Sequence, residues 1–192
     1  WTFDPMRGAN ARLNIEKLGA TVAELTLDKY GVLRSSLYGD VPSDRFTAHW
    51  DLRSPRTLGR LDAVAGDRLP RAGAATLAGM PEATTATAAR LAAERAPTVW
   101  YRIPADIDAA MRADPAAAIA WRGEMRKVFG CFLTVARAEW QVGAANDPAN
   151  IAVRTTPGAY VITRFVSATD STGERLNAYV LERWQPESRE EK

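Results

Sequence analysis

Segments that look like strands alternate with strong helix starts along this chain, which limits it to folds that mix the two. Two Asp-Pro pairs, Asp4-Pro5 and Asp114-Pro115, place an N-cap aspartate before a proline whose missing N–H costs nothing in a first helical turn. Gly19 suits the position just past a helix end. These signals predict helices over 5–18 and about 115–136, and a mixed α/β (α+β) protein.

The clearest predicted strand covers 45–52, where apolar and polar residues alternate. Its apolar members, Phe46, Ala48, Trp50 and Leu52, are expected to face inward. A loop is predicted over 33–43 and a short helix over 106–112. Further strands are predicted over 22–30, 98–103, 151–153, 160–166 and 176–183, the last two joined as a hairpin.

The composition changes between residues 53 and 97, which are rich in Ala, Gly, Pro, Arg and Thr. Such a stretch is typical of a linker, here with one Ala-rich helix over 82–95. The chain is therefore expected to divide into a first part over 1–52, a linker over 53–97, a small α+β extension over 98–184 and a polar tail over 185–192. Trp1 is not a start methionine and opens an apolar strand, so we expect the chain to be part of something longer.

Composition also excludes several classes of protein. The 25 Lys and Arg residues against 23 Asp and Glu give a net charge of +2, which offers no electrostatic case for nucleic acid or a membrane surface. No apolar run approaches the ~20 residues of a spanning helix, and no signal peptide is present, so a cytoplasmic location is expected. One cysteine, Cys131, and one histidine, His49, exclude a disulfide framework, a thiolate-rich metal site and a multi-His metal centre.

Two groups of short motifs follow one another along the chain. The first group is Trp1-Thr2-Phe3-Asp4-Pro5, Asn10-Ala11-Arg12-Leu13-Asn14 and Lys17-Leu18-Gly19-Ala20, and the second is Pro42-Ser43-Asp44-Arg45, Trp50-Asp51-Leu52, Ile103-Pro104-Ala105-Asp106, Ala120-Trp121-Arg122 and Ala178-Tyr179-Val180-Leu181. The first group resembles the back half of the GNAT superfamily of acyltransferases, in which a strand leads into a helix packed beside coenzyme A. The second group is similar to one subgroup of predicted acyltransferases that is linked to N-succinylamino acid racemases.

The resemblance implies the C-terminal half of an acyl-CoA N-acyltransferase-like fold followed by an α+β extension. It implies transfer of an acetyl or succinyl group from an acyl-CoA co-substrate to a small-molecule amine or amino acid, without a metal. Whether the protein forms a homodimer is left open. Asn10 and Asn14 lie four residues apart on one predicted helix face, where they would bind the coenzyme. The alternative is a solvated or helix-packing pair of asparagines.

Three residues, Asp44, Arg45 and His49, are the substrate-binding candidates, at the start of and along the strand over 45–52. Arg45 could pair bidentately with a substrate carboxylate, and His49 could remove a proton from an amine. The alternatives are a structural contact between Asp44 and Arg45, and a surface histidine without a role. Cys131 is expected to be a packed core thiol. A set of three basic residues, Arg122, Arg126 and Lys127, is expected to form a solvated face.

The chain also departs from the family pattern. The nearest approach to the family's phosphate-binding loop is Arg56-Thr57-Leu58-Gly59-Arg60-Leu61, but Leu61 stands where a small residue is needed, so the loop is expected upstream of Trp1. The helix tyrosine that often serves as general acid aligns with Ile15, which cannot donate a proton. These departures keep a second hypothesis open, a non-catalytic binding or scaffold protein that retains the fold. The residues before Trp1 would discriminate between the two.

Overall fold

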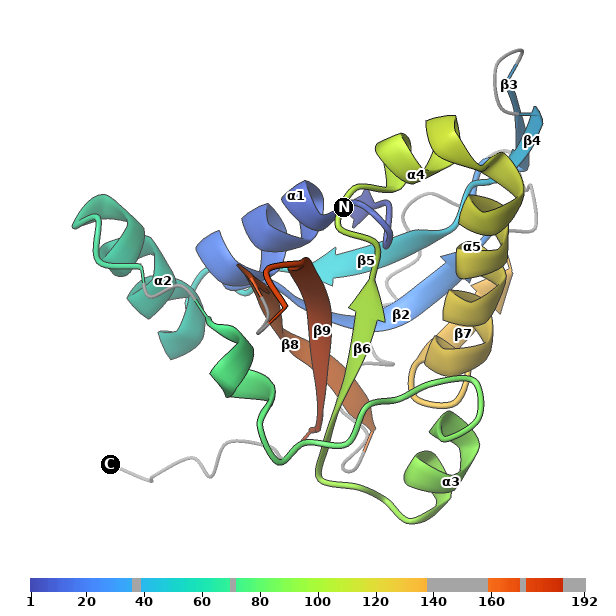
Figure 1. Cartoon of the computed structure of the whole chain (residues 1–192). Helices are drawn as coiled ribbons and strands as arrows, with labels where there is room; N and C mark the ends of the chain where they lie inside the picture. Colours follow the sequence, from blue (N-terminus) through green and yellow to red (C-terminus); the bar gives the residue numbers. More distant parts are fainter. Residues whose placement is uncertain (36–38, 70–71, 138–158, 170–171, 185–192) are drawn as a thin grey trace.

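A seven-stranded sheet forms the centre of the molecule (Figure 1). The computed structural model describes residues 1–35, 39–69, 72–137, 159–169 and 172–184. Six strands lie in the order β1 (Thr2–Phe3), β5 (Arg45–His49), β2 (Thr21–Leu27), β8 (Tyr160–Thr169), β9 (Arg175–Arg183) and β6 (Thr98–Ile103), and β7 (Thr134–Arg137) pairs with β2.

The strand β2 joins the two halves of this sheet. One edge of β2 pairs with β5, while the other pairs with β8 at Val22 and with β7 from Glu24 to Leu27. The β2–β7 pairing is parallel, and the other pairings in the sheet are antiparallel. A mixed sheet with helices confirms the predicted α+β class.

The first strand–helix–strand unit is close to its prediction. After β1 comes a continuous helix, α1 (Gly8–Ala11) followed by the π-helical η1 (Arg12–Lys17), and then β2. Because β5 lies between β1 and β2 and runs antiparallel to both, β1 and β2 are parallel. The helix ends at Gly19, whose φ of +75° is the left-handed conformation that glycine adopts without strain.

The helix starts of the second half were also predictable. The strand β6 covers the predicted 98–103, and the carboxylates of Asp106 and Asp114 cap α4 (Ile107–Ala113) and α5 (Pro115–Phe129). Prediction of a helix to 136 was wrong, because α5 ends at Phe129 and a turn leads into β7. The hairpin of β8 and β9 is confirmed.

The described residues of the expected linker over 53–97 contain three helices rather than the one predicted over 82–95. The expected loop over 33–43 contains a hairpin of β3 (Val32–Ser35) and β4 (Gly39–Pro42). The helix α2 (Pro55–Ala65) begins where the Ser54 hydroxyl accepts a bond from the Thr57 N–H at 3.1 Å. The other two are η2 (Ala74–Leu77), a 3₁₀ helix, and α3 (Ala88–Ala93). The sequence contained the Ser-Pro start of α2, but its low apolar content hid the helix.

One core connects residues from both ends of the chain. Phe46 of β5, Phe129 of α5 and Tyr179 of β9 are fully buried and meet edge to face, with ring centroids 5.0 to 5.8 Å apart. The opposite face of β8 and β9 carries a second apolar cluster, in which Val166 and Val180 pack with Leu77 of η2. The parts predicted over 1–52 and 98–184 therefore share a sheet and a core.

Some predictions fail or lie outside the described residues. Leu52 was expected to face inward but is 58 % exposed, because β5 ends at His49. Cys131 is exposed rather than packed in the core. The predicted strand over 151–153 and the polar tail over 185–192 lie outside the described residues. Within the described part of the chain, no helix is both long and apolar enough to cross a membrane.

Candidate functional site

Two of the residues predicted from the sequence border one cavity. Asn10 of α1 and Arg45 of β5 line a hollow of about 480 Å³, hereafter the Asn10–Arg45 cavity. Its walls come from β1 and the β1–α1 connection, from α1, from the end of β4 and the start of β5, and from α4 and α5. Arg7 also reaches this cavity. The cavity therefore combines an amide side chain with three guanidinium groups, those of Arg7, Arg45 and Arg122, and two carboxylates, which makes it a polar site for a small molecule.

The charges around this cavity differ in how far they are already neutralised. Arg122 is buried and forms a fork with Asp4, with N–O distances of 3.1 and 2.9 Å. Arg7 pairs with Asp108 at 2.9 Å. Among the described residues, Arg45 donates only to the Asp44 backbone carbonyl, at 2.7 Å, and its guanidinium lies 5.1 Å from the centroid of the Tyr30 ring. Most of the five N–H donors of Arg45 are thus available to a carboxylate.

Asn14 does not join Asn10 at the cavity. Its side chain is 4 % exposed, and its Oδ1 accepts a hydrogen bond from Trp1 Nε1 at 3.0 Å. The reason is the π-helical geometry of η1, in which the Leu18 N–H bonds to the Leu13 carbonyl five residues earlier. The wider turn rotates Asn14 away from the face that an α-helix would share with Asn10. Asn14 thus has the helix-packing role that the sequence left as an alternative.

Asp44 is closed to solvent and holds α5. Its side chain is fully buried and accepts two bonds from Arg126, from Nε at 2.8 Å and Nη2 at 2.7 Å. A third bond comes from the Asp28 N–H at 3.0 Å. Hydrogen bonding to Asp44 raises the pKa of Arg126 above its ordinary value. The prediction that Arg122 and Arg126 are a solvated face is wrong, because both arginines bind carboxylates far away in the sequence.

His49 lies at a different place. Four residues along β5 separate it from Arg45, which is about 13 Å at ~3.3 Å per residue. Its own surroundings are a hollow of about 580 Å³ that Trp50, Arg56 and Trp184 also line. The structure therefore does not bring His49 to the cavity of Asn10 and Arg45.

Arg56 belongs to the segment 56–61, which lacks the small residue that a phosphate-binding loop needs. The segment lies inside α2, and Arg56 Nε donates to the Gly19 carbonyl at 2.8 Å while Nη2 bonds to the Thr163 carbonyl. Burial lowers the pKa of Arg56. Its guanidinium thus fastens α2 to the end of η1 and to β8.

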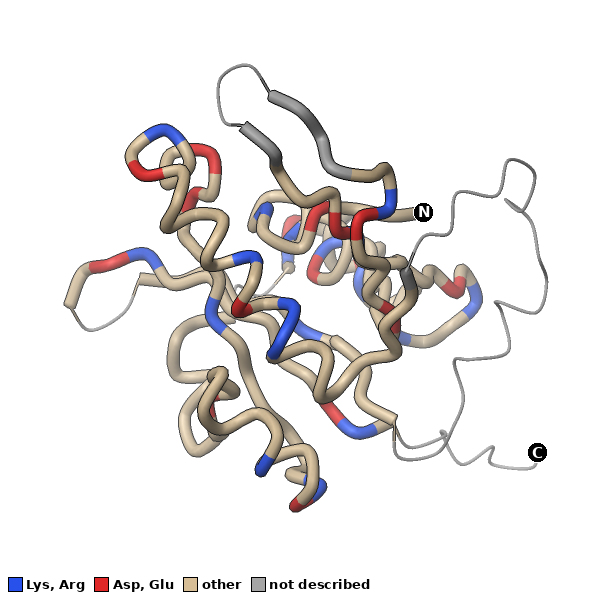
Figure 2. Tube along the Cα trace, turned by 90° about the vertical axis from the view of Figure 1, so that its right-hand side faces the viewer, with Lys and Arg blue, Asp and Glu red and all other residues tan. Residues whose placement is uncertain are grey.

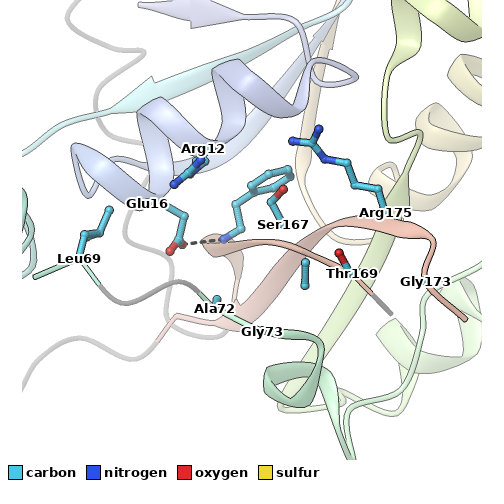
Figure 3. Close-up of a pocket in the computed structure, with 11 residues that line it drawn as sticks. Arg12, Glu16, Leu69, Ala72, Gly73, Ser167, Thr169, Gly173 and Arg175 are labelled. Atoms are coloured by element: carbon cyan, nitrogen blue, oxygen red, sulfur yellow. Dashed lines mark hydrogen bonds between the residues drawn. The ribbon is translucent and has the colours of Figure 1, made fainter. Parts of the chain in front are cut away.

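Sequence reasoning missed a second polar hollow, which Figure 3 shows. It lies between the helix formed by α1 and η1 and the β8–β9 hairpin, has a volume of about 540 Å³ and is bordered by Arg12, Ser167 and Arg175. At its floor the buried Glu16 carboxylate accepts the Phe165 N–H at 2.9 Å. Alternation of polar and apolar residues along both hairpin strands was the signal that could have found it.

Comparison with family models, curated proteins and solved structures gives no match. Over the described residues, no group of three or more His, Cys, Asp and Glu side chains is placed to hold a metal ion. Positive and negative residues are interspersed along the trace in Figure 2.

Proposed function

We propose that this chain supplies the coenzyme-side wall and part of the acceptor pocket of an acyl-CoA-dependent N-acyltransferase. The acyl group, acetyl or succinyl, passes from a thioester to the amine of a small molecule such as an amino acid. The strand–helix–strand unit of β1, the α1–η1 helix and β2, with β5 inserted between the strands, supports this proposal. Of this unit, the strand that leads into a helix is what the resemblance implies.

The observation that carries the proposal is the meeting of Asn10 and Arg45 at one cavity. The motif resemblance gives Asn10 to the coenzyme, and the guanidinium of Arg45 suits the carboxylate of an acceptor. An acyl transferase must hold both substrates close together, because the amine nitrogen attacks the thioester carbon directly. A shared cavity of about 480 Å³ has room for the reacting ends of two such molecules.

Each side chain then has a defined task. Arg45 orients the acceptor by its carboxylate, so that the amine faces the thioester. Asn10 offers an amide hydrogen bond to the coenzyme. The C–N bond forms as the C–S bond breaks, and the amine proton passes to water or to a base of the complete site. Ile15 takes no part, because it is fully buried and apolar.

Steady-state kinetics on the full-length protein, with both substrates varied, test the proposal. A hydrogen bond is worth ~0.5–1.5 kcal/mol, so Asn10→Ala should raise the KM of the acyl-CoA about three- to tenfold and leave the KM of the acceptor nearly unchanged. Arg45→Ala should show the reverse pattern. Arg112→Ala removes an exposed arginine of α4 that does not line the cavity and is the control. If both variants keep wild-type constants for both substrates, neither residue lines the site.

The second candidate function is a non-catalytic binding or scaffold protein. The buried Ile15, at the position where the family carries a general acid, favours it. A phosphate-loop pattern of Arg or Gln, two residues, Gly, one residue and Gly or Ala before Trp1 would favour the enzyme. Binding of acyl-CoA by the full-length protein without any turnover would favour the scaffold.

A further inference from the structure

The face of the β8–β9 hairpin that lies under the α1–η1 helix becomes polar toward its tip. Residues directly paired across antiparallel strands point to the same face, so Ser167 and Asn177 project together. Arg175 comes two residues before Asn177 and shares that face. Deeper in the molecule the same face carries Phe165 and Tyr179 into the core. Along this face, from the core toward the tip of the hairpin, the side chains therefore change from apolar to polar and then to charged.

Above this polar end lies a continuous groove. The hollow of about 540 Å³ adjoins another of about 480 Å³, which is not the Asn10–Arg45 cavity. Both have Arg12, Ser167 and Arg175 in their walls. Figure 3 shows Arg12 and Arg175 on opposite sides of Ser167, one on the helix and the other on β9. We call the combined space the hairpin groove.

Asn177 provides an unpaired acceptor in this groove. Its side chain is 2 % exposed and lines the second hollow. The amide orientation is set by Nδ2, which donates to the Ala105 carbonyl at 3.1 Å. Its Oδ1 meets no donor among the described residues. A buried acceptor of this kind costs free energy, which a ligand carrying an N–H or O–H would recover.

The charges of the groove favour an anion. Within the described part of the chain, Arg12 and Arg175 make no ion pair within 4 Å and no side-chain hydrogen bond. Lys17 also borders the groove. Two acids line its second hollow too: Asp108, which is paired with Arg7, and Asp106, whose carboxylate caps α4 and lies near Arg175. The basic residues still outnumber these two acids. Guanidinium groups match the geometry of carboxylate and phosphate oxygens.

We propose that the hairpin groove binds a small organic anion that presents a phosphate or carboxylate to Arg12 and Arg175 and an O–H or N–H, a few bonds away, to Asn177 Oδ1. Asn10 lines this groove as well as the Asn10–Arg45 cavity, whereas Arg45 does not line the groove, so Arg45→Ala separates this proposal from acyl transfer. Two features of the described residues define the ligand: two guanidinium groups without an ion pair and a buried acceptor without a donor.

Calorimetric titration of the chain with glycerol 3-phosphate and with L-malate tests the site, and also shows which acid it takes. One of the two is expected to bind saturably, and neutral glycerol is not. Arg12→Gln and Arg175→Gln should each weaken binding about tenfold or more, because each removes charge-assisted hydrogen bonds. Arg90→Gln, a change at an exposed arginine of α3, should leave it unchanged, as should Arg45→Ala.

The role of Asn177 is tested through the ligand, since its Nδ2 also supports the fold. Methyl phosphate and succinate keep the acid groups but lack the donor, so each should bind more weakly than its hydroxylated counterpart. Equal binding with and without the hydroxyl would overturn the role of Asn177. Failure of both acids to saturate, or an equal loss in Arg90→Gln, would overturn the site, while a loss confined to Arg45→Ala would move the anion to the other cavity.

Discussion

Two carboxylates, the partly buried Asp4 and the fully buried Asp44, hold α5 on the sheet. Asp4 holds Arg122 and Asp44 holds Arg126, so two arginines one helical turn apart are both fastened to the first fifty residues. The pairs span 118 and 82 residues. Breaking such a pair leaves a buried charge without its partner, which costs far more than losing an exposed pair.

We therefore expect Asp44→Ala to lower the free energy of unfolding by roughly 2–4 kcal/mol, somewhat below the ~3–5 kcal/mol of fully buried pairs because Arg126 is 30 % exposed. Asp62→Ala is the matched control, since the Asp62–Arg68 pair is exposed and should contribute less than ~1 kcal/mol. Urea unfolding at neutral pH measures both changes. Equal losses in the two variants would contradict a structural role for Asp44.

Two buried tyrosines of neighbouring strands provide a second test at this scale. Tyr179 donates its hydroxyl to the Pro5 carbonyl at 2.6 Å, whereas the buried Tyr101 hydroxyl has no partner among the described residues. Tyr179→Phe should cost about 1 kcal/mol, while Tyr101→Phe should be neutral or stabilising, because it removes an unsatisfied group. Thermal unfolding of both variants measures the difference, and the opposite order would contradict these assignments.

At the scale of elements, residues with a local signal were predictable. The alternation over 45–52 predicted β5, and Phe46 and Ala48 are buried as expected. The same pattern failed at Leu52, because the strand gives way to a turn at Asp51, where the Arg53 N–H bonds to the Asp51 carboxylate. The π-helical turn that separates Asn10 from Asn14 has no such signal. It depends on how the helix packs on β8.

Gly19 connects three elements and can be tested against a matched glycine. Its φ is +75°, and an added Cβ would lie 3.2 Å from the Thr57 backbone of α2. Gly79 has a φ of +76° with open space around it. Both Gly→Ala changes carry the cost of a left-handed backbone, about 1 kcal/mol, but Gly19→Ala should cost more because α2 must shift. Equal losses in denaturant unfolding would show that α2 does not press on this position.

At the scale of the whole molecule, the sequence predicted two parts joined by a linker, and the structure joins them in one sheet. The strands β1, β5 and β2 come from the first part, and β8, β9 and β6 from the second. Composition alone could not show this, because the pairing of β2 with β8 joins residues 140 positions apart, Val22 and Ile162. Asn10 and Arg45 were candidates from the sequence, but neither their meeting at one cavity nor the hairpin groove was predicted.

A shared sheet and core should unfold together. We expect one cooperative transition, with the same midpoint by far-ultraviolet circular dichroism and by tryptophan fluorescence, since Trp50 and Trp100 lie in opposite halves. Two separated transitions, or midpoints that differ between the two probes, would contradict a single core and support the two-part division instead.

The proposed role of the Asn10–Arg45 cavity is acyl transfer from an acyl-CoA thioester to an amine. The most direct measurement is release of the coenzyme thiol by the full-length protein, with acetyl-CoA and succinyl-CoA and a panel of amino acids and their decarboxylated amines. We expect amine-dependent release of the coenzyme thiol, with a preference for acceptors that carry a carboxylate. We expect Arg45→Ala to lose this preference. Release that no amine stimulates from either thioester would contradict the proposed role.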